Sequence, residues 1–328
     1  MSSLDIIVPH YHEPWKICKP LFDSIALQRG INFEDISVIV VNDGDDVVFP
    51  NGTFLQYPYR VEYIIKEHSG LSSTRNRGLD ESDADYVMFC DSDDQFINSL
   101  ALKMIWMEME RERNIINPVF LEESWDAKKG EMVYITHKSD ATFIHGKAYR
   151  RALLAEKGIR FPDGLNLHED GCFNSLAICT GQDAIVEINT PLYLWAWNPD
   201  STVRHEPYFV VRTYDKLCES WRRGLTWLKE HGYEKEYIHV VCKAVICTYY
   251  NFQTYPFQIA ANAKLKREAE RAFRKLYMEV RDDFLSCDDK MYSRFMEILR
   301  DESVKSGGFL YELITLNDWL KHIEHEVK

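Results

Sequence analysis

The acidic segment Asp91-Ser92-Asp93-Asp94 directly follows an apolar run, Tyr86 to Cys90. Carboxylates this close repel one another and resist losing their hydration. Such a cluster is either a solvated acidic turn or a site that binds something positive. The side chains of Asp91 and Asp93 can both address one hard cation, because Mg²⁺ and Mn²⁺ prefer oxygen ligands. Acidic turns are common, so the spacing alone is a weak signal, but its place after a strand favours a metal site.

Two further polar clusters follow apolar runs. His10 and Tyr11 come after "DIIVP", and the segment 42–45 comes after "VIVV". In a parallel sheet, ligands sit outside the carboxyl ends of the strands. We therefore expect all three clusters to share one rim of a sheet and to face a crevice.

The elements that would position these clusters alternate along the first part of the chain. Strand-like runs are "LDIIVPHY", "ISVIVV", "RVEYIIKE" and "YVMFC", and helical spacing is found in "PWKICKPLFDSIALQ" and "LSSTRNRGLDES". Continuous apolar strands separated by helices predict an α/β fold with a mainly parallel sheet covered on both faces. After about residue 205 the patterning becomes helical, so we expect a catalytic domain over 1–205 and a helical region over 206–328.

Composition narrows the class of protein. The chain has 328 residues and a net charge of −13, which makes it a poor non-specific binder of nucleic acid or anionic membranes. Its eight cysteines show no CxxC pair, so a structural zinc site is not expected and a reducing compartment fits best. The sequence shows neither a signal-peptide pattern nor an apolar run of membrane-spanning length. We expect a cytoplasmic protein that is at most peripherally attached to a membrane.

Four blocks carry a family resemblance. In order, "IIVPHYHEPWKICKPLFDSIALQ", "VIVVNDGDD", "HSGLSSTRNRGLDESDADYVMFCDSDD" and "FIHGKAYRRALLAEKGIRFPDGLNLHEDGCFN" resemble family 2 glycosyltransferases of the GT-A fold, over roughly residues 3–203. No GxxxxGK[ST], GxGxxG or GxSxG motif competes with this reading. The QxxRW motif of processive members is also absent, and "SWRRG" at 220–224 does not match it. The resemblance implies a non-processive enzyme that uses a nucleotide sugar and a divalent metal, Mn²⁺ or Mg²⁺, with inversion at the anomeric carbon.

The resemblance also implies roles for the donor site. Pro9 and Tyr11 match positions that pack on the base, and Asp43 matches a carboxylate that binds the base, usually uracil. Arg75 lies where it could meet the base or the diphosphate. The DxD motif comprises Asp91, Ser92 and Asp93, in which Asp91 contacts the ribose or metal-bound water and Asp93 binds the metal. The predicted donor and metal residues are Pro9, Tyr11, Asp43, Arg75, Asp91, Ser92, Asp93 and, as a further metal ligand or phosphate contact, His205.

The predicted catalytic base is Asp170, which matches the family's base position in "HED". Its neighbour Glu169 is a competitor, and both could instead complement a helix N-terminus. In "FIHGKAYRR", His145 and Lys147 are expected to line the donor-sugar or acceptor side, although single His and Lys residues are more often surface groups. His68 is left open between a diphosphate contact and a loop residue. Trp195 and Trp197 are expected in the core or as sugar-stacking platforms.

The expected function is sugar transfer from a UDP-sugar to a surface saccharide or its lipid-linked precursor. The same chemistry on nucleic acid or protein is an alternative, supported only by a locally basic stretch over 263–281 that a solvated helix face explains more simply. A GT-A scaffold that only binds ligands is a third reading, which the presence of a base at Asp170 opposes. The helical region could hold the acceptor, form a homo-oligomer or cover the sheet.

Overall fold

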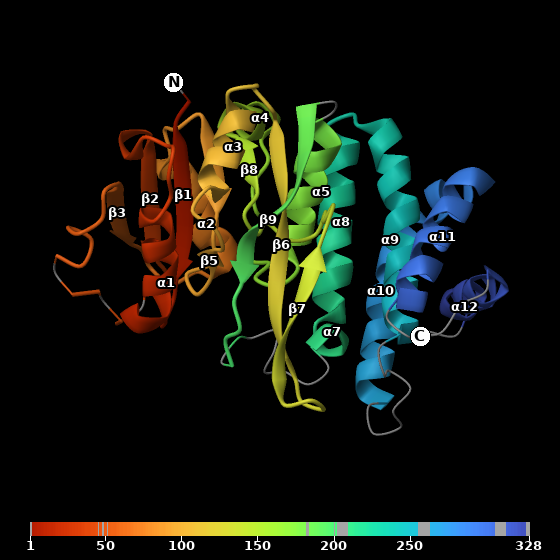
Figure 1. Ribbon diagram of the computed structural model, residues 1–328. Helices are drawn as coiled ribbons and strands as arrows, with labels where there is room; N and C mark the ends of the chain where they lie inside the picture. Colours follow the sequence, from red (N-terminus) through yellow and green to blue (C-terminus); the bar gives the residue numbers. More distant parts are fainter. Residues whose placement is uncertain are drawn as a thin grey trace. The chain divides into compact units, whose positions relative to one another are not determined.

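The computed structural model describes most of the chain (Figure 1). It falls into two compact units, Met1–Pro199 and Asp200–Lys328, which we describe separately. The described residues are 2–44, 46–47, 49–50, 52–181, 184–199, 201, 209–254, 263–305 and 313–325.

The first unit is built on a nine-stranded sheet of order β3-β2-β1-β4-β8-β6-β9-β5, with β7 paired to β6 (Figure 1). Four neighbouring strands at one end of this order, β3, β2, β1 and β4, are all parallel. Their carboxyl ends therefore meet at one edge, as the sequence predicts. The bounds of the four are β1 Leu4–His10, β2 Ile36–Asn42, β3 Arg60–Ile65 and β4 Tyr86–Phe89.

The apolar sequence of these strands explains their central position. Every residue of β1 is buried, as is nearly all of β2, because helices pack on the sheet. Helix α1 (Trp15–Ala26) buries Leu21, Phe22 and Ile25 in the same core as the two strands. Helix α2 (Leu71–Glu81) packs on β1 and β2. The expected α/β fold is confirmed, together with the strands and helices predicted up to residue 90.

The remaining strands make the sheet mixed rather than mainly parallel. Strand β8 (Ala148–Arg150) pairs antiparallel with β4, and β6 (Ile115–Asp126) pairs antiparallel with β8 and with β7 (Glu131–His137). The β6–β7 turn forms because Asp126 accepts hydrogen bonds from backbone N–H groups of the turn and Gly130 adopts a positive φ of 69°. Other elements of this unit are β5 Gln95–Phe96, α3 Ala101–Met109, α4 Arg151–Lys157, α5 Glu169–Gly181 and β9 Ile185–Trp195.

The second unit is helical, as expected for the C-terminal region. Helices α8, α9 and α10 pack on one another, and Trp319 of α12 contacts Phe273 of α10. Among the described residues, no helix is both long and apolar enough to cross a membrane. The helices are α7 Phe209–Arg212, α8 Tyr214–Glu230, α9 Glu234–Thr254, α10 Ala263–Leu285, α11 Asp289–Lys305 and α12 Leu313–His325.

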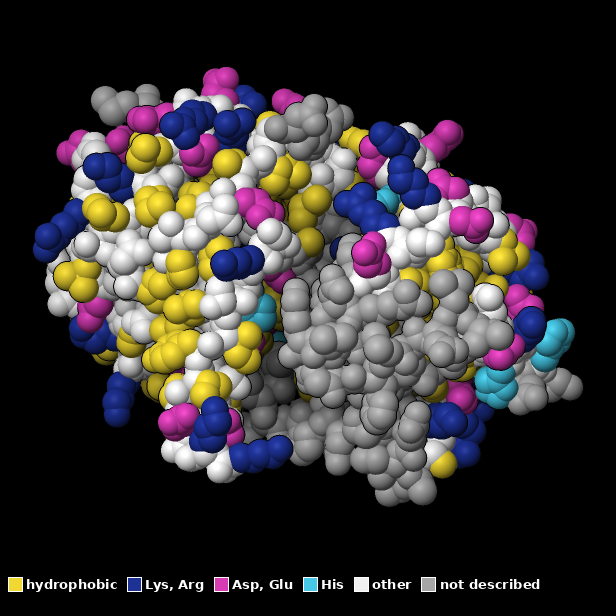
Figure 2. Space-filling model, turned by 45° about the vertical axis from the view of Figure 1, so that its right-hand side comes forward, with side chains coloured by type: hydrophobic (Ala, Val, Ile, Leu, Met, Phe, Trp, Pro, Cys, Tyr) yellow, Lys and Arg dark blue, Asp and Glu magenta, His cyan; other side chains and the backbone are white. Residues whose placement is uncertain are grey.

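The basic stretch over 263–281 lies on α10, where several of its charges are paired. Lys264 and Lys266 each lie 3.8 Å from a glutamate one turn further on, and Arg281 Nε lies 2.7 Å from Glu324. Basic and acidic side chains are also interspersed on the face drawn in Figure 2. This arrangement is that of a solvated helix surface.

Candidate active site

The acidic turn after β4 is held together by its last residue, Asp94. This side chain is fully buried, and it accepts hydrogen bonds from the Tyr193 hydroxyl (2.8 Å) and the Ala196 N–H (2.9 Å). Burial and the negative charges of Asp93 and Asp91 raise its pKa well above the usual value. Asp94 therefore supports the turn from beneath, while Asp91 and Asp93 are only half-buried.

Asp91 and Asp93 have different neighbours. Asp91 Oδ1 lies 2.9 Å from Arg75 Nη2, whereas Asp93 Oδ2 accepts a 2.7 Å hydrogen bond from the Asn198 side chain. Burial, the largest single effect, opposes ionisation of Asp91, but the charge and hydrogen bond of Arg75 together with His145 outweigh it and lower the pKa of Asp91. Asp91 is thus held as a carboxylate at the edge of the sheet. Ser92, between the two, is buried against Glu13 and Cys18.

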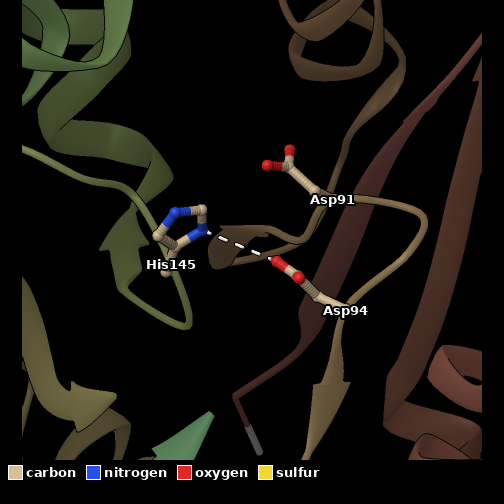
Figure 3. Close-up of side chains that lie close together, drawn as sticks. All are labelled: Asp91, Asp94 and His145. Carbon is tan, nitrogen blue, oxygen red and sulfur yellow. Dashed lines mark ion pairs between the residues drawn. The ribbon is translucent and has the colours of Figure 1, made fainter. Parts of the chain in front are cut away.

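A histidine joins this turn from the segment before β8. Figure 3 shows the His145 ring facing Asp94, with Asp91 beside them, and His145 Nδ1 lies 3.7 Å from Asp94 Oδ2. One ligand atom from each of the three side chains lies within 4.8 Å of the others. Burial lowers the pKa of His145 to about 4, so the ring is neutral, and its Nδ1 is buried without a hydrogen bond among the described residues. Of these three groups, the Asp91 carboxylate and the neutral His145 imidazole are donors of the kind that bind a divalent cation, whereas both Asp94 oxygens already accept hydrogen bonds.

The predicted base, Asp170, contacts one terminal nitrogen of Arg75, and Asp91 contacts the other. Asp170 and Glu169 form the first turn of α5, and Arg75 Nη1 lies 2.7 Å from an oxygen of each. Burial raises the pKa of Asp170 well above its usual value; Arg75 offsets part of this rise, and the Glu169 charge adds to it. The fold thus brings Asp170 into contact with Arg75, which lies 95 positions earlier in the sequence.

A further carboxylate, Asp43, directly follows β2. Its Oδ1 pairs with Lys66 and accepts the Ser69 N–H (3.0 Å), and its Oδ2 accepts the Gly70 N–H (2.8 Å) and lies 2.9 Å from His68 Nδ1. Burial would raise the pKa of Asp43, but these donors, Lys66 first among them, lower it.

Two exposed aromatic rings stand beside Asp43. Tyr11, just after β1, stacks on His68 with ring centroids 4.7 Å apart and an interplanar angle of 24°. Both rings are accessible to solvent, whereas Pro9 is buried within β1. Tyr11 and His68 therefore form a flat platform at the same edge of the sheet as Asp43.

Two of the remaining candidates, Lys147 and Trp195, pack among neighbouring side chains of the first unit. Lys147 is fully buried, with its Nζ 3.4 Å from Asp140 and hydrogen-bonded to the Phe143 carbonyl. Trp195 packs on Phe143 and His145 in an aromatic cluster, in agreement with its reading as a core residue. His205 lies outside the described residues.

Sequence reasoning named Trp197 but missed its neighbours Ala196 and Asn198, which also follow β9. Three carboxylates accept hydrogen bonds from the segment 196–198. Asp94 accepts from the Ala196 N–H, and Glu123 of the β6–β7 hairpin accepts from the Trp197 N–H (2.9 Å). Asp93 accepts from the Asn198 side chain. No local signal in the sequence marks Asn198 as a partner of Asp93, 105 residues earlier.

Comparisons with known proteins identify relatives of this chain. "Glycosyltransferase GlyA" of Streptococcus pneumoniae is 26% identical over 260 residues, which is 72% of this chain and 36% of that protein. The chain spans about a third or less of the length of the first curated relatives it matches.

Solved structures share the fold. Residues 1–349 of TarS from S. aureus match 94% of this chain and 93% of that chain, with a TM-score of 0.58 and 17% identity. The same protein in complex with UDP-GlcNAc matches the same shares at a TM-score of 0.52 and 17% identity. A mannosyltransferase from Pyrobaculum calidifontis, in complex with GDP-Man and Mn²⁺, covers 99% of this chain and 87% of its own at a TM-score of 0.50 and 13% identity.

The family assignment rests on a match to more than half of the chain. The protein-family model described as "Glycosyl transferase family 2" matches residues 5–176 of this chain. This range contains the DxD turn, Arg75 and Asp170. The chain belongs to glycosyltransferase family 2.

Proposed function

We propose that this protein is an inverting, metal-dependent glycosyltransferase that moves a sugar from a UDP-sugar to an acceptor hydroxyl. The observation that carries the proposal is the junction at Arg75, where the first aspartate of the DxD turn and the predicted base, Asp170, contact the same guanidinium. A donor held at one end of this junction would present its anomeric carbon near the base at the other. Transfer of a sugar requires both parts in one place.

The nucleotide would lie along the rim from Tyr11 to Asp91. The exposed Tyr11–His68 platform offers a face on which a base can stack. A carboxylate has about four lone-pair sites, and Asp43 already has four donors around it. A base N–H would therefore take the place of the Lys66 or His68 contact. The TarS complex with UDP-GlcNAc supports a uridine nucleotide.

A divalent cation would be held by Asp91 and Asp93, with His205 as a further predicted ligand. His145 Nδ1, which lies beside Asp91 and Asp94 and makes no hydrogen bond among the described residues, supports the binding of a cation at this edge of the sheet. When bound, the metal supplies positive charge that stabilises the diphosphate leaving group. The mannosyltransferase complex with Mn²⁺ supports manganese among the divalent ions.

Asp170 would act as the general base. As the acceptor hydroxyl attacks the anomeric carbon, its proton passes to an Asp170 oxygen, a new C–O bond forms and the bond to the diphosphate breaks on the opposite face, which inverts the configuration. We propose a surface saccharide or its lipid-linked precursor as the acceptor. The chain's net charge of −13 opposes a nucleic-acid acceptor.

Substitution of Asp170 tests this function. We expect Asp170→Asn to lower the release of UDP from UDP-GlcNAc or another UDP-sugar by about 10²- to 10⁴-fold, because a positioned base contributes that much. Calorimetry should show donor affinity within about threefold of wild type, well short of a tenfold change in the binding constant. The matched control is Asp289→Asn, an exposed aspartate in the first turn of α11. Equal turnover by Asp170→Asn and wild type would contradict the assignment.

A further inference from the structure

Arg75 is buried at the centre of the site in a way that fixes the plane of its guanidinium. It lies on α2 and is 1% exposed, and its guanidinium carbon lies 5.3 Å from the centre of the Phe161 ring. Its Nε makes no hydrogen bond among the described residues, so the contacts of the guanidinium are made by its two terminal nitrogens. A planar group that lies over a ring and is closed off from water has little freedom to change its direction.

The two terminal nitrogens point at opposite parts of the site. Nη2 contacts Asp91 (2.9 Å), and Nη1 contacts both Glu169 and Asp170 (2.7 Å each). One rigid fork therefore sets the separation between the DxD turn, after β4, and the start of α5. A lysine ammonium carries the same charge on a flexible stem and cannot reproduce this planar geometry.

A second set of contacts binds α2 to the chain that leads into α5. The Ser72 hydroxyl donates to the Leu165 carbonyl, and the Asn76 side chain both donates to the Phe161 carbonyl (2.9 Å) and accepts from the Phe161 N–H (3.0 Å). These contacts come from the same helix as Arg75. Helix α2 thus anchors the approach to α5, and Arg75 completes that anchor at the catalytic end.

We propose that Arg75 is a positioning residue that couples the donor-binding turn to the catalytic base, holding the Asp170 carboxylate at a fixed distance and direction from Asp91. This role rests on the proposed function, since it assigns Asp170 as the base and Asp91 to the donor. It differs from the contact with the base or diphosphate that the family resemblance implies for Arg75. In this structure the guanidinium is directed to carboxylates on both sides.

The test is Arg75→Lys, assayed for UDP release from UDP-GlcNAc or another UDP-sugar that wild type turns over. We expect kcat to fall about 100-fold, because a misplacement of about 1 Å can cost that much. The donor KM should stay within about threefold, less than a tenfold effect on binding. The matched control is Arg77→Lys, on the same helix, where an exposed arginine pairs with Glu81. A wild-type kcat in Arg75→Lys would overturn the proposal, because charge alone would then suffice.

A second variant covers the case in which Arg75→Lys does not fold. The pair Arg75→Met and Glu169→Gln removes one buried cation and one buried anion together, which keeps the buried charge balanced. We expect this double variant to turn over about 100-fold more slowly than Glu169→Gln alone. Equal rates would overturn the proposal. If the wild-type protein does not release UDP from any UDP-sugar, the proposed function itself is contradicted. A failure of the proposed function can therefore be distinguished from a failure of the role proposed for Arg75.

Discussion

Asp43 shows how one carboxylate can order a whole turn. It follows β2, and it draws the Ser69 and Gly70 N–H groups together with Lys66 and His68. The sequence predicted Asp43 as part of the rim because it follows an apolar strand. It could not predict the four donors, since they come from a segment more than 20 residues away whose approach depends on the pairing of β2 with β3.

Asp43→Asn should therefore destabilise the protein in a pH-dependent way. Because the pKa of Asp43 is lowered in the folded state, the native protein holds fewer protons than the unfolded chain at acid pH. Its contribution is present above the unfolded value near 3.9 and is lost as pH falls through the lower folded pKa. We expect a loss of about 1–3 kcal/mol at pH 7 that shrinks below about pH 4, measured by urea unfolding.

The control for this prediction is Asp282→Asn, whose side chain is 93% exposed. That variant should match wild type within about 0.5 kcal/mol at every pH. A loss in Asp43→Asn that is the same at pH 3 and pH 7 would show that shape rather than charge sets the contribution of this residue.

At the scale of elements, the four parallel strands and the helices between them were predictable, and the hairpin and its neighbours were not. Every residue of the run "LDIIVPH" is buried, and its mainly apolar sequence is enough to predict a buried strand. Strand β6 changes from buried to half-exposed along its length, so no single period describes it. Likewise, the Arg75 junction depends on the contact of α2 with residues 161–170, which only the assembled fold supplies.

The close packing of α2 on β1 leads to a prediction at Gly78. A Cβ at this position would lie 2.4 Å from Ile7 Cγ2 in the centre of the sheet. We expect Gly78→Ala to lower the free energy of unfolding by about 1–3 kcal/mol, because overpacking outweighs the gain in helix propensity. Chemical denaturation measures this change.

Gly171 of α5 is the matched control, because a Cβ there would meet only Thr142 Cγ2, at 4.0 Å. Gly171→Ala should leave stability unchanged or raise it by about 0.5–1 kcal/mol. If Gly78→Ala were as stable as Gly171→Ala, the tight contact between α2 and β1 would be contradicted.

At the scale of the whole molecule, net charge favours a saccharide acceptor over a nucleic-acid acceptor. The chain carries a net charge of −13, and several basic residues of α10 are paired with glutamates. The sequence predicted both the acidic balance and the solvated character of this helix. It could not identify the acceptor, because specificity depends on the shape of a pocket rather than on motifs.

We accordingly expect no saturable binding of a fluorescent single-stranded RNA or DNA oligonucleotide at 50 or 200 mM salt, measured by anisotropy. Binding to phosphates by a basic groove would weaken steeply over this range. Saturable binding at 50 mM that is lost at 200 mM would contradict the saccharide acceptor and favour a nucleic acid.

The measurement that tests the central claim most directly is thermal stabilisation by UDP-GlcNAc and other UDP-sugars, with and without Mn²⁺, for wild type and Asp93→Ala. A ligand that binds the native state at about 100 times its Kd stabilises it by about 2.7 kcal/mol. We predict a rise in Tm with one UDP-sugar that requires Mn²⁺ and is lost in Asp93→Ala. The absence of a shift with every UDP-sugar, in the presence of Mn²⁺, would contradict the proposed donor site.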